Sequence, residues 1–198
     1  MKTPRYQSRI FVVSGPSGSG KTTMIDEMMK DSANASLFVR VVTATTRAPR
    51  PGEVDGVQYH FLSKDEFKKR EAEGWFIETK EYSGNWYGTP KMYVECAKAE
   101  GKSVLFCIEV DGAMRIKEVY PRETVLVFVY PPSQEELRRR LGGRGTDSEE
   151  VIARRMAIAQ EELRFADRYD HGIVNDELGI AVDELVAVIT AGRTATAK

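Results

Sequence analysis

The segment at residues 15–22, GPSGSGKT, holds the residue types that most directly indicate chemistry, because it fits the pattern G-x-x-x-x-G-K-[ST]. Glycines let a backbone turn tightly and point its N–H groups at phosphate oxygens, and a helix N-terminus favours negative charge. We expect Lys21 to reach the β- and γ-phosphates of a nucleoside triphosphate, and the Thr22 hydroxyl to bind Mg²⁺. The predicted nucleotide-binding residues are Gly15, Pro16, Ser17, Gly18, Ser19, Gly20, Lys21, Thr22 and Thr23.

A glycine-rich turn with a surface lysine is the alternative interpretation of this segment. However, an apolar run precedes it at residues 10–14, and a helix-like pattern follows from Lys21. A strand before and a helix after are the context that a phosphate loop requires. The segment therefore predicts nucleotide binding, although it does not identify the reaction.

Three charged side chains elsewhere have a possible chemical role. Arg47 and Arg50 lie three residues apart in TTRAPR, and guanidinium groups bind phosphate oxygens in pairs. Taken alone, both arginines could equally face solvent in a proline-rich loop. Glu78 in FIETKEY would, in isolation, be interpreted as a solvent-facing strand residue.

The elements that must position these residues alternate along the chain. Apolar and β-branched runs predict strands, and periodic patterns between them predict helices. The expected strands cover residues 10–14, 37–42, 103–110 and 124–130, with a last one from Ile173, and the expected helices include 21–30 and 180–190. This alternation predicts an α/β fold with a parallel sheet flanked by helices.

Helix boundaries are marked by short patterns. SKDE at residues 63–66 and SQEE at 133–136 are capping boxes. Thr89 followed by Pro90 predicts an N-cap with proline at the first helical position, and Gly101 would end that helix. Residues 43–88 instead contain short aromatic-rich runs, which predict a small inserted mixed α+β lobe.

Composition limits the remaining possibilities. The 198 residues are 41% hydrophobic and 30% charged with a net charge of −1, which favours one globular domain without a global basic field for nucleic acid. No apolar run is long enough for a membrane span or a signal-peptide core. Cys96 and Cys107 lie in apolar contexts, so we expect buried free thiols, a reducing compartment and a cytoplasmic location. A monomer or small homo-oligomer is expected.

From about Arg9 to Ile189 the chain resembles the guanylate kinases. The matching stretches are SGPSGSGKTT, TTRAPRPGEVDGVQYHF, FIETKEYSGNWYGTP, PPSQEELRRRLGGRGTDSEEVIARRM and IVND. Members of this family transfer the γ-phosphoryl group of ATP to GMP, giving GDP and ADP. The resemblance therefore implies ATP and GMP as substrates, Mg²⁺ accompanying ATP, and the fold of the phosphate-loop nucleoside monophosphate kinases.

The resemblance also implies roles for individual residues. Four residues would hold the GMP phosphate, namely Arg47, Arg50, Tyr59 and Tyr87. Four others would surround the rest of GMP, with Glu78 on the guanine edge and with Thr43, Thr89 and Glu109 near it. The residues expected to act on the transferring phosphates are Lys21, Arg47, Arg140, Arg144 and Arg155, and Asn175 would lie on the adenine side.

The chain departs from the family pattern at four positions. Glu109 stands where the family often has aspartate, Asp111 where it usually has glutamine, and Thr79 where it often has tryptophan. Cys107 replaces another frequent acid and is expected to be a buried strand residue. These departures bear on turnover and base selectivity, but none removes a charge that the mechanism needs.

The resemblance implies three parts. A core of residues 1–42, 90–136 and 156–198 would hold ATP, a lobe of residues 43–89 would hold GMP, and a lid of residues 137–155 would close over both. Two alternatives are a non-catalytic module of the same fold and a kinase for another acceptor. The retained Lys21 and lid arginines argue against the first, and the retained Glu78 argues against the second. Because no residue is evidently dedicated to the ribose 2′-hydroxyl, dGMP should also be accepted.

Overall fold

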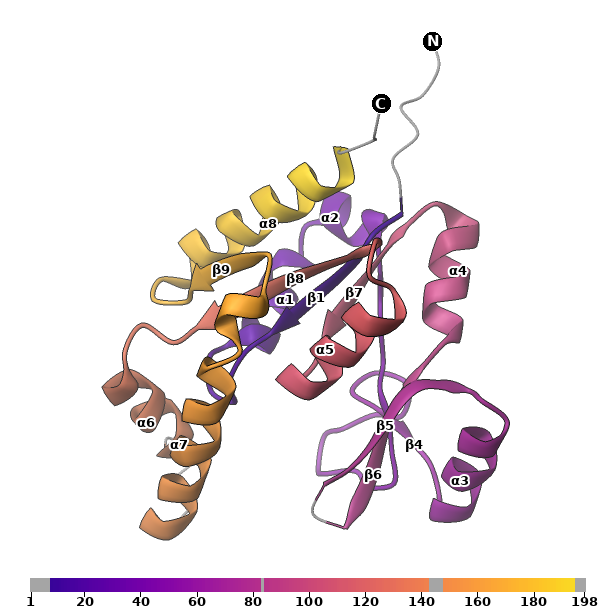
Figure 1. Ribbon diagram of the computed structural model, residues 1–198, viewed down its shortest axis with the longest axis horizontal. Coiled ribbons are helices and arrows are strands. Elements are labelled where there is room, and N and C mark those ends of the chain that lie inside the picture. The colour runs from indigo at the N-terminus through magenta and orange to yellow at the C-terminus, as the bar shows by residue number, and fades with distance from the viewer. Residues whose placement is uncertain (1–7, 83, 143–147, 195–198) are drawn as a thin grey trace.

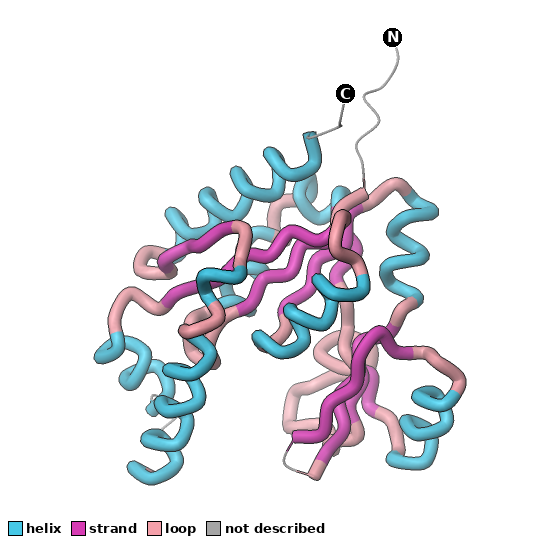
Figure 2. The backbone as a smooth tube through the Cα atoms, in the orientation of Figure 1, coloured by secondary structure: helices cyan, strands magenta, loops and turns pink. Residues whose placement is uncertain are grey.

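The computed structural model describes residues 8–82, 84–142 and 148–194. Its main layer is a five-stranded sheet in the order β2-β7-β1-β8-β9, in which every pairing is parallel (Figures 1 and 2). The strands are β1 (Ile10–Ser14), β2 (Phe38–Arg40), β7 (Ser103–Cys107), β8 (Thr124–Tyr130) and β9 (His171–Val174). The predicted α/β fold with a parallel sheet is confirmed.

Helices cover both faces of this sheet, because alternate strand residues point to opposite sides. Phe11 and Val13 of β1 pack towards α1 (Lys21–Met28) and α8 (Leu178–Thr194). Ile10 and Val12 pack towards α4 (Met92–Glu100) and α5 (Val110–Val119). The short helix α2 (Ser32–Leu37) leads into β2. The strand that precedes the phosphate loop is therefore fixed by a buried core on each side.

A second, smaller sheet follows the order β4-β3-β6-β5. Its strands are β3 (Ala44–Thr45), β4 (His60–Phe61), β5 (Phe76–Tyr82) and β6 (Asn85–Pro90). Helix α3 (Lys64–Ala72) packs on it through Phe67, which contacts Phe76 and Ala44. The sheet is mixed, since β3 and β4 are parallel and the other pairs are antiparallel.

Helices α6 (Gln134–Gly142) and α7 (Glu149–Leu163) pack against each other through Leu137, Leu141 and Ala159. A short 3₁₀ helix, η1 (Ala166–Arg168), connects α7 to β9. The α6–α7 pair and the small sheet project from the same side of the large sheet and are separated from each other (Figure 1). Arg144, which was expected to act in catalysis, lies outside the described residues.

Several predicted boundaries were correct. Ser63 and Ser133 each accept a backbone N–H three residues later, as capping boxes require. Gly101 ends α4 with a positive φ of 66°. Strand β8 covers the whole predicted run of residues 124–130.

Other boundaries were wrong. The N-cap predicted at Thr89 does not exist, because Thr89 and Pro90 belong to β6 and α4 begins at Met92. The predicted strand at 103–110 ends at Cys107, since Val110 already begins α5. The run at 37–42 becomes strand only from Phe38, because α2 extends to Leu37.

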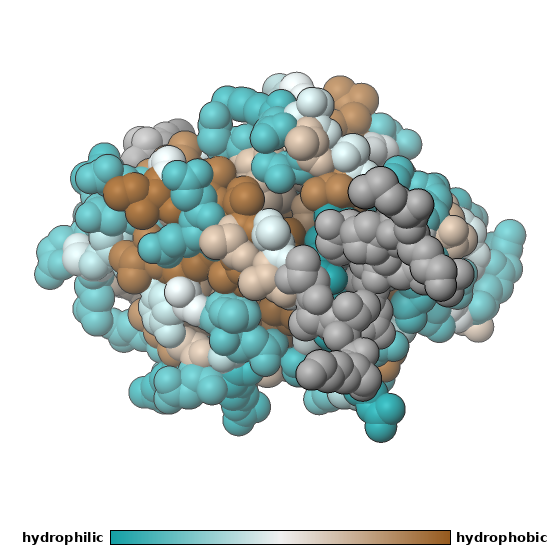
Figure 3. All heavy atoms as spheres, turned by 90° about the horizontal axis from the view of Figure 1, so that it is seen from above, coloured by the Kyte–Doolittle hydropathy of each residue, from teal (hydrophilic) through white to brown (hydrophobic). Residues whose placement is uncertain are grey.

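The surface mixes polar and apolar side chains. The face seen in Figure 3 shows apolar patches interrupted by hydrophilic residues. Cys96, which was expected to be buried, is exposed on α4, whereas Cys107 is half-buried at the end of β7. Among the residues that the structure describes, no helix has the length and apolarity needed to cross a membrane.

Candidate functional site

The phosphate loop lies between β1 and α1, where glycines are required by close backbone packing. Gly15 has φ 137°, and a Cβ there would lie 2.4 Å from the carbonyl oxygen of Val129. Gly20 has φ 89°, and a Cβ there would lie 2.2 Å from Nδ2 of Asn175. Both φ values lie where residues with a Cβ are strained. The loop is thus wedged against β8 on one side and against the end of β9 on the other.

Lys21 lies inside the curve of the loop. Its Nζ donates hydrogen bonds to the carbonyl oxygens of Gly15, at 2.6 Å, and Pro16, at 2.9 Å. Burial lowers the pKa of Lys21, while the nearby groups of Cys107, Glu162 and Glu109 raise it. The ammonium is therefore held by backbone carbonyls at the place where the loop would receive phosphate.

A cavity of about 530 Å³ opens beside the loop. The residues that line it are Ser17, Gly18, Gly20, Lys21, Thr22, Thr23, Arg140, Asn175, Asp176 and Leu178. The structure thus brings Arg140 and Asn175, which are distant in the sequence, together with most of the predicted loop residues. The three other loop residues, Gly15, Pro16 and Ser19, are buried behind the cavity wall.

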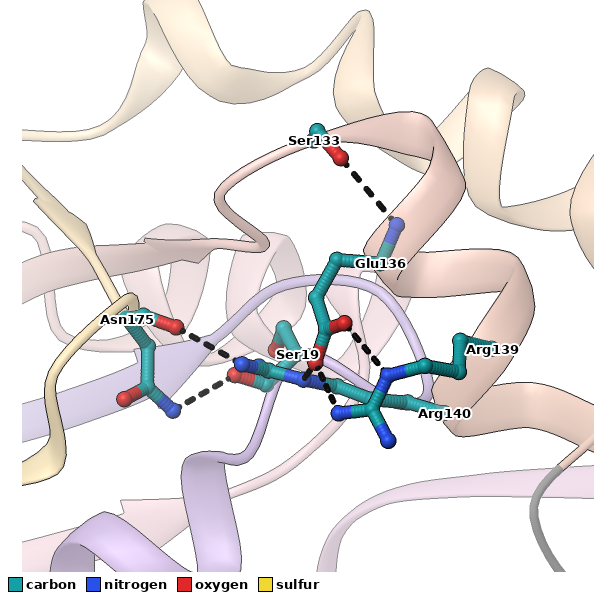
Figure 4. A network of polar contacts seen from close by, with 6 residues as sticks. All are labelled: Ser19, Ser133, Glu136, Arg139, Arg140 and Asn175. Carbon is teal, nitrogen blue, oxygen red and sulfur yellow. Dashed lines mark hydrogen bonds and ion pairs between the residues drawn. The ribbon is translucent and has the colours of Figure 1, made fainter.

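A polar network fixes the far wall of this cavity (Figure 4). Asn175, which is 5% exposed, donates through Nδ2 to the carbonyl oxygen of Ser19 at 2.8 Å. Arg140 donates through Nη2 to the carbonyl oxygen of Asn175 at 3.2 Å, and through Nε to Glu136 at 2.7 Å. Hydrogen bonds from Arg139 and then Arg140 lower the pKa of Glu136 to about 2, so Glu136 is ionised and orients both guanidinium groups.

Arg155 reaches the opposite side of the loop from α7. Its Nη1 donates to the carbonyl oxygen of Leu141 at 3.1 Å, and its Nη2 lies 3.2 Å from the hydroxyl oxygen of Ser17. Two arginine side chains from the α6–α7 pair therefore approach the phosphate loop. Arg138 and Arg139 are exposed on α6, as expected of surface charges, and pair with Glu149 and Glu136.

The residues near Thr22 determine which metal the site suits. Thr22 is exposed at the start of α1, and its hydroxyl oxygen lies 3.8 Å from the sulfur of Cys107. Over the described ranges 8–82, 84–142 and 148–194, no three His, Cys, Asp or Glu side chains form a metal cluster. Mg²⁺ usually binds through one or two protein oxygens, phosphate oxygens and water, so a single hydroxyl beside a phosphate site fits it.

A second cavity, of about 230 Å³, lies between the small sheet and the end of β7. The residues that line it are Thr43, Tyr59, Glu78, Lys80, Tyr82, Tyr87, Thr89, Cys107, Ile108, Glu109 and Gly112. Six of the eight residues predicted to bind GMP therefore meet here. Arg47 and Arg50 are not among the lining residues.

Glu78 is the central acid of this cavity. The hydroxyl of Thr89, which is fully buried, donates to Oε1 of Glu78 at 2.6 Å. Burial raises the pKa of Glu78, with a smaller increase from Glu109, whereas the Thr89 hydrogen bond and the charge of Lys80 lower it. Thr89 therefore uses its hydroxyl to orient a carboxylate rather than to cap α4.

Arg47 lies beside Tyr59, which lines this cavity, and is held by Glu53. Its Nη2 lies 2.9 Å from each carboxylate oxygen of Glu53, and its guanidinium carbon lies 5.4 Å from the centre of the Tyr59 ring. The ring of Tyr87 is 6.1 Å from that of Tyr59. Arg50 is exposed and donates its backbone N–H to Glu53 at 2.7 Å. The structure thus brings Arg47 to the two tyrosines but leaves the Arg50 side chain in solvent.

Sequence reasoning missed four residues that belong to these sites. Glu53 orients Arg47, Glu136 orients Arg140, Lys80 lines the second cavity, and Glu162 lies near Lys21. Lys80 could have been found, since residues two apart on a strand share a face with Glu78. The contact of Glu136 with Arg140 follows helical i,i+4 spacing. Nothing in the sequence pattern places Glu162 near a loop 140 residues away.

Comparisons with known proteins agree with this geometry. The sequence profile of the guanylate kinase family, described as "Guanylate kinase", matches residues 7–192. The chain is 48% identical over 184 residues to a guanylate kinase of Sphingopyxis alaskensis, covering 93% of this chain and 82% of the relative. It is 46% identical over 187 residues to one of Lactococcus lactis, covering 94% and 89%.

The structure is similar to the crystal structure of guanylate kinase from Anaplasma phagocytophilum. The TM-score is 0.78 at 29% sequence identity, and the match covers 97% of this chain and 89% of the other. The profile match, the identities over nearly the whole chain and the shared fold show that this chain belongs to the guanylate kinase family.

Proposed function

We propose that the phosphate loop of this guanylate kinase binds ATP, and that the cavity of the small sheet binds GMP as the acceptor. The chain catalyses GMP phosphorylation, as its family does. The assignment of residues to this reaction is our proposal. The observation that carries it is the Glu78 carboxylate, which Thr89 orients inside the second cavity. This cavity also reaches Cys107, at the end of β7 in the sheet that leads into the phosphate loop.

The guanine edge suits the geometry around Glu78. Guanine presents N1–H and an N2 amine as two adjacent donors, and an ionised carboxylate accepts from both. Adenine instead presents an acceptor at N1, which a carboxylate repels. A buried carboxylate left unpaired by the wrong base is costly, so such a site can discriminate by roughly 10⁴-fold. Thr43 and Glu109 line the same cavity and would contact the remaining polar atoms of the base.

The GMP phosphate would bind at Arg47, Tyr59 and Tyr87. Nη2 of Arg47 already contacts both carboxylate oxygens of Glu53, and the guanidinium has further N–H donors that phosphate oxygens can accept. Glu53 therefore keeps Arg47 in place and ionised before the nucleotide arrives. Arg50 would join only by moving its exposed side chain inwards.

The transferring group would be stabilised by cations from three elements. Lys21 supplies a charge from the loop, Arg140 from α6 and Arg155 from α7. Phosphoryl transfer depends mainly on positioning and on charge stabilisation, so no covalent nucleophile is needed. Arg144 is proposed for the same role on the resemblance alone. Thr22 would hold Mg²⁺ together with the ATP phosphates, and the ion would supply positive charge that offsets the negative charge of the phosphates.

These positions divide the chain into three parts with different proposed roles. Residues 1–42, 90–136 and 156–198 would form the ATP-binding core, residues 43–89 the GMP lobe, and residues 137–155 the lid. The two cavities must approach each other for in-line transfer, so we infer that the small sheet and the α6–α7 pair draw together when both nucleotides bind. dGMP would be a second acceptor. The free thiols suit a cytoplasmic location, and a monomer or small homo-oligomer is proposed.

The test is ADP formation from ATP and Mg²⁺ with GMP or AMP as acceptor, in the wild type and in Glu78→Gln. We expect the variant to lose roughly 10²-fold or more in kcat/KM for GMP, because an amide cannot accept both donors of guanine. Glu81→Gln, at an exposed position on the same strand, is the matched control and should retain activity. Undiminished GMP turnover in Glu78→Gln would refute the assignment of the guanine-binding residue.

A further inference from the structure

Lys80 occupies a position next to the proposed guanine-binding carboxylate. Residues 78 and 80 lie on β5, where side chains two apart share a face. Both side chains line the second cavity, whereas Thr79 between them points away and donates its hydroxyl to Glu71. A strand facing this cavity therefore presents an acid and a base side by side.

Lys80 is also paired across the two parts of the molecule. Its Nζ lies 2.5 Å from Oδ2 of Asp111, in the first turn of α5 on the large sheet. The two side chains are 44% and 65% exposed, so the pair contributes little to stability. The pair matters instead because it holds the charged Lys80 ammonium at the wall of the cavity.

The protonation state of Glu78 decides which purine it accepts. An ionised carboxylate accepts from N1–H and N2–H of guanine. A neutral carboxyl offers one donor and one acceptor, which match N1 and the N6 amine of adenine. Burial and the charge of Glu109 favour the neutral form of Glu78, whereas the Thr89 hydrogen bond and, after it, the charge of Lys80 favour the ionised form. The titratable or charged groups that face this region are Tyr59, Lys80, Tyr82, Tyr87, Cys107, Glu109 and Asp111.

We propose that Lys80 is a specificity-determining residue that acts through Glu78, keeping the carboxylate ionised so that the acceptor cavity takes GMP in preference to AMP. This proposal rests on the proposed role of Glu78. Asp111 has the opposite effect, because its carboxylate pairs with the ammonium of Lys80 and offsets part of its charge. The pair thus sets the balance between the ionised and neutral forms.

The experiment measures how kcat/KM for GMP depends on pH in the wild type, Lys80→Met and Asp111→Asn. The part of each profile that is compared is the acid limb, where kcat/KM falls as the pH is lowered. We expect Lys80→Met to move the limb to higher pH by roughly half a unit, the size expected of one screened charge, so that kcat/KM on the acid side of the limb falls about threefold. We expect Asp111→Asn to move the limb to lower pH. The phosphate of GMP titrates in this range for every variant, so the differences isolate the protein.

Shifts of the acid limb in opposite directions in the two variants distinguish this electrostatic role from a purely mechanical one. If the ion pair only joined the small sheet to α5, both variants would lose the same contact. Their acid limbs would then shift in the same direction. The GMP-over-AMP ratio of kcat/KM should also fall in Lys80→Met as the pH is lowered. Lys98→Met, on the exposed surface of α4 where Lys98 pairs with Glu123, is the matched control.

Two results would overturn the proposal, namely an unmoved limb in Lys80→Met or shifts of the same sign in both variants. Its failure is distinguishable from failure of the proposed function by the Glu78→Gln variant. If Glu78→Gln loses GMP turnover while the limb stays fixed in Lys80→Met, Glu78 binds guanine without help from Lys80. If Glu78→Gln keeps GMP turnover, both assignments fall together.

Discussion

The two cavities that are proposed to bind nucleotides are built by different means. The donor end is made of backbone, since loop N–H groups and close-packed glycines at Gly15 and Gly20 shape it between strands of a buried sheet. The acceptor end is made of side-chain pairs, such as Glu78 with Thr89 and Arg47 with Glu53, on a small and partly exposed sheet. A backbone site tolerates almost no change, whereas a side-chain site can be retuned one pair at a time.

The largest expected difference between the two ends is the loss of stability when a glycine is replaced by alanine. Gly15→Ala would place a Cβ 2.4 Å from the Val129 carbonyl oxygen, on a strand fixed on both faces, so we expect a loss of more than about 3 kcal/mol in unfolding free energy. Gly52→Ala, near Arg50 at the acceptor end, meets no atom within 4 Å, and its φ of 85° should cost only about 1 kcal/mol. Urea unfolding measures both. Equal losses would show that backbone packing does not separate the two ends.

A smaller effect is expected from the buried hydroxyl at the acceptor end. Thr89→Val keeps the shape of the side chain but removes the donor to Glu78, so KM for GMP should rise about five- to tenfold, the equivalent of one lost hydrogen bond. KM for ATP should stay within about twofold, because the donor end does not depend on this pair. Steady-state kinetics with Thr79→Val as control tests this, since the Thr79 hydroxyl bonds Glu71 outside the cavity. A parallel rise in KM for ATP would contradict the prediction that the donor end is independent of the Thr89–Glu78 pair.

The smallest effect concerns Glu162, which lies near Lys21 at the donor end. Burial, followed by the charge of Glu109, raises the pKa of Glu162 to about 6. Because this value lies above the ordinary 4.5, the folded state binds more protons between these pH values, and stability is lost as the pH rises through that window. Glu162→Gln should therefore be more stable than the wild type at pH 7.5, by about 1 kcal/mol or less after solvent screening.

At pH 4.5 the stability difference between Glu162→Gln and the wild type should nearly vanish. Urea unfolding at the two pH values measures it, with Glu161→Gln as the neighbouring control on the same helix. Glu161 pairs with Arg164 on the surface, so its substitution should give no pH-dependent gain. A gain of equal size at both pH values would show that charge is not the cause.

The two ends also differ in how far the sequence alone predicts them. The loop at residues 15–22 was predictable because its geometry follows from local residue types and from the strand and helix that flank it. The large sheet followed from apolar runs such as residues 124–130, which form β8 without change. Long buried strands depend on burial alone, so their sequence pattern is strong.

The acceptor end was less predictable from residue patterns. Isolated, Glu78 resembles any strand carboxylate, and only its partner Thr89 on β6 distinguishes it. Thr89 itself was mistaken for a helix cap, because Thr-Pro favours both a helix start and a strand end, and tertiary pairing decided between them. The pairing of Lys80 with Asp111 joins residues 31 apart on different layers, which no local rule anticipates.

The chain enters and leaves the small sheet on two paired strands, β3 and β6. Ala44 of β3 and Gly88 of β6 are direct cross-strand partners, so the chain enters and leaves this sheet at adjacent points. Antiparallel partners have Cα atoms about 5 Å apart, a gap that a bridge of two or three residues spans. The acceptor sheet is therefore a cassette in the topological sense. Its exchange for another insertion would leave the threading of the parallel sheet unchanged, provided that the replacement supplies the apolar contact that Ile77 of β5 makes with the core of that sheet.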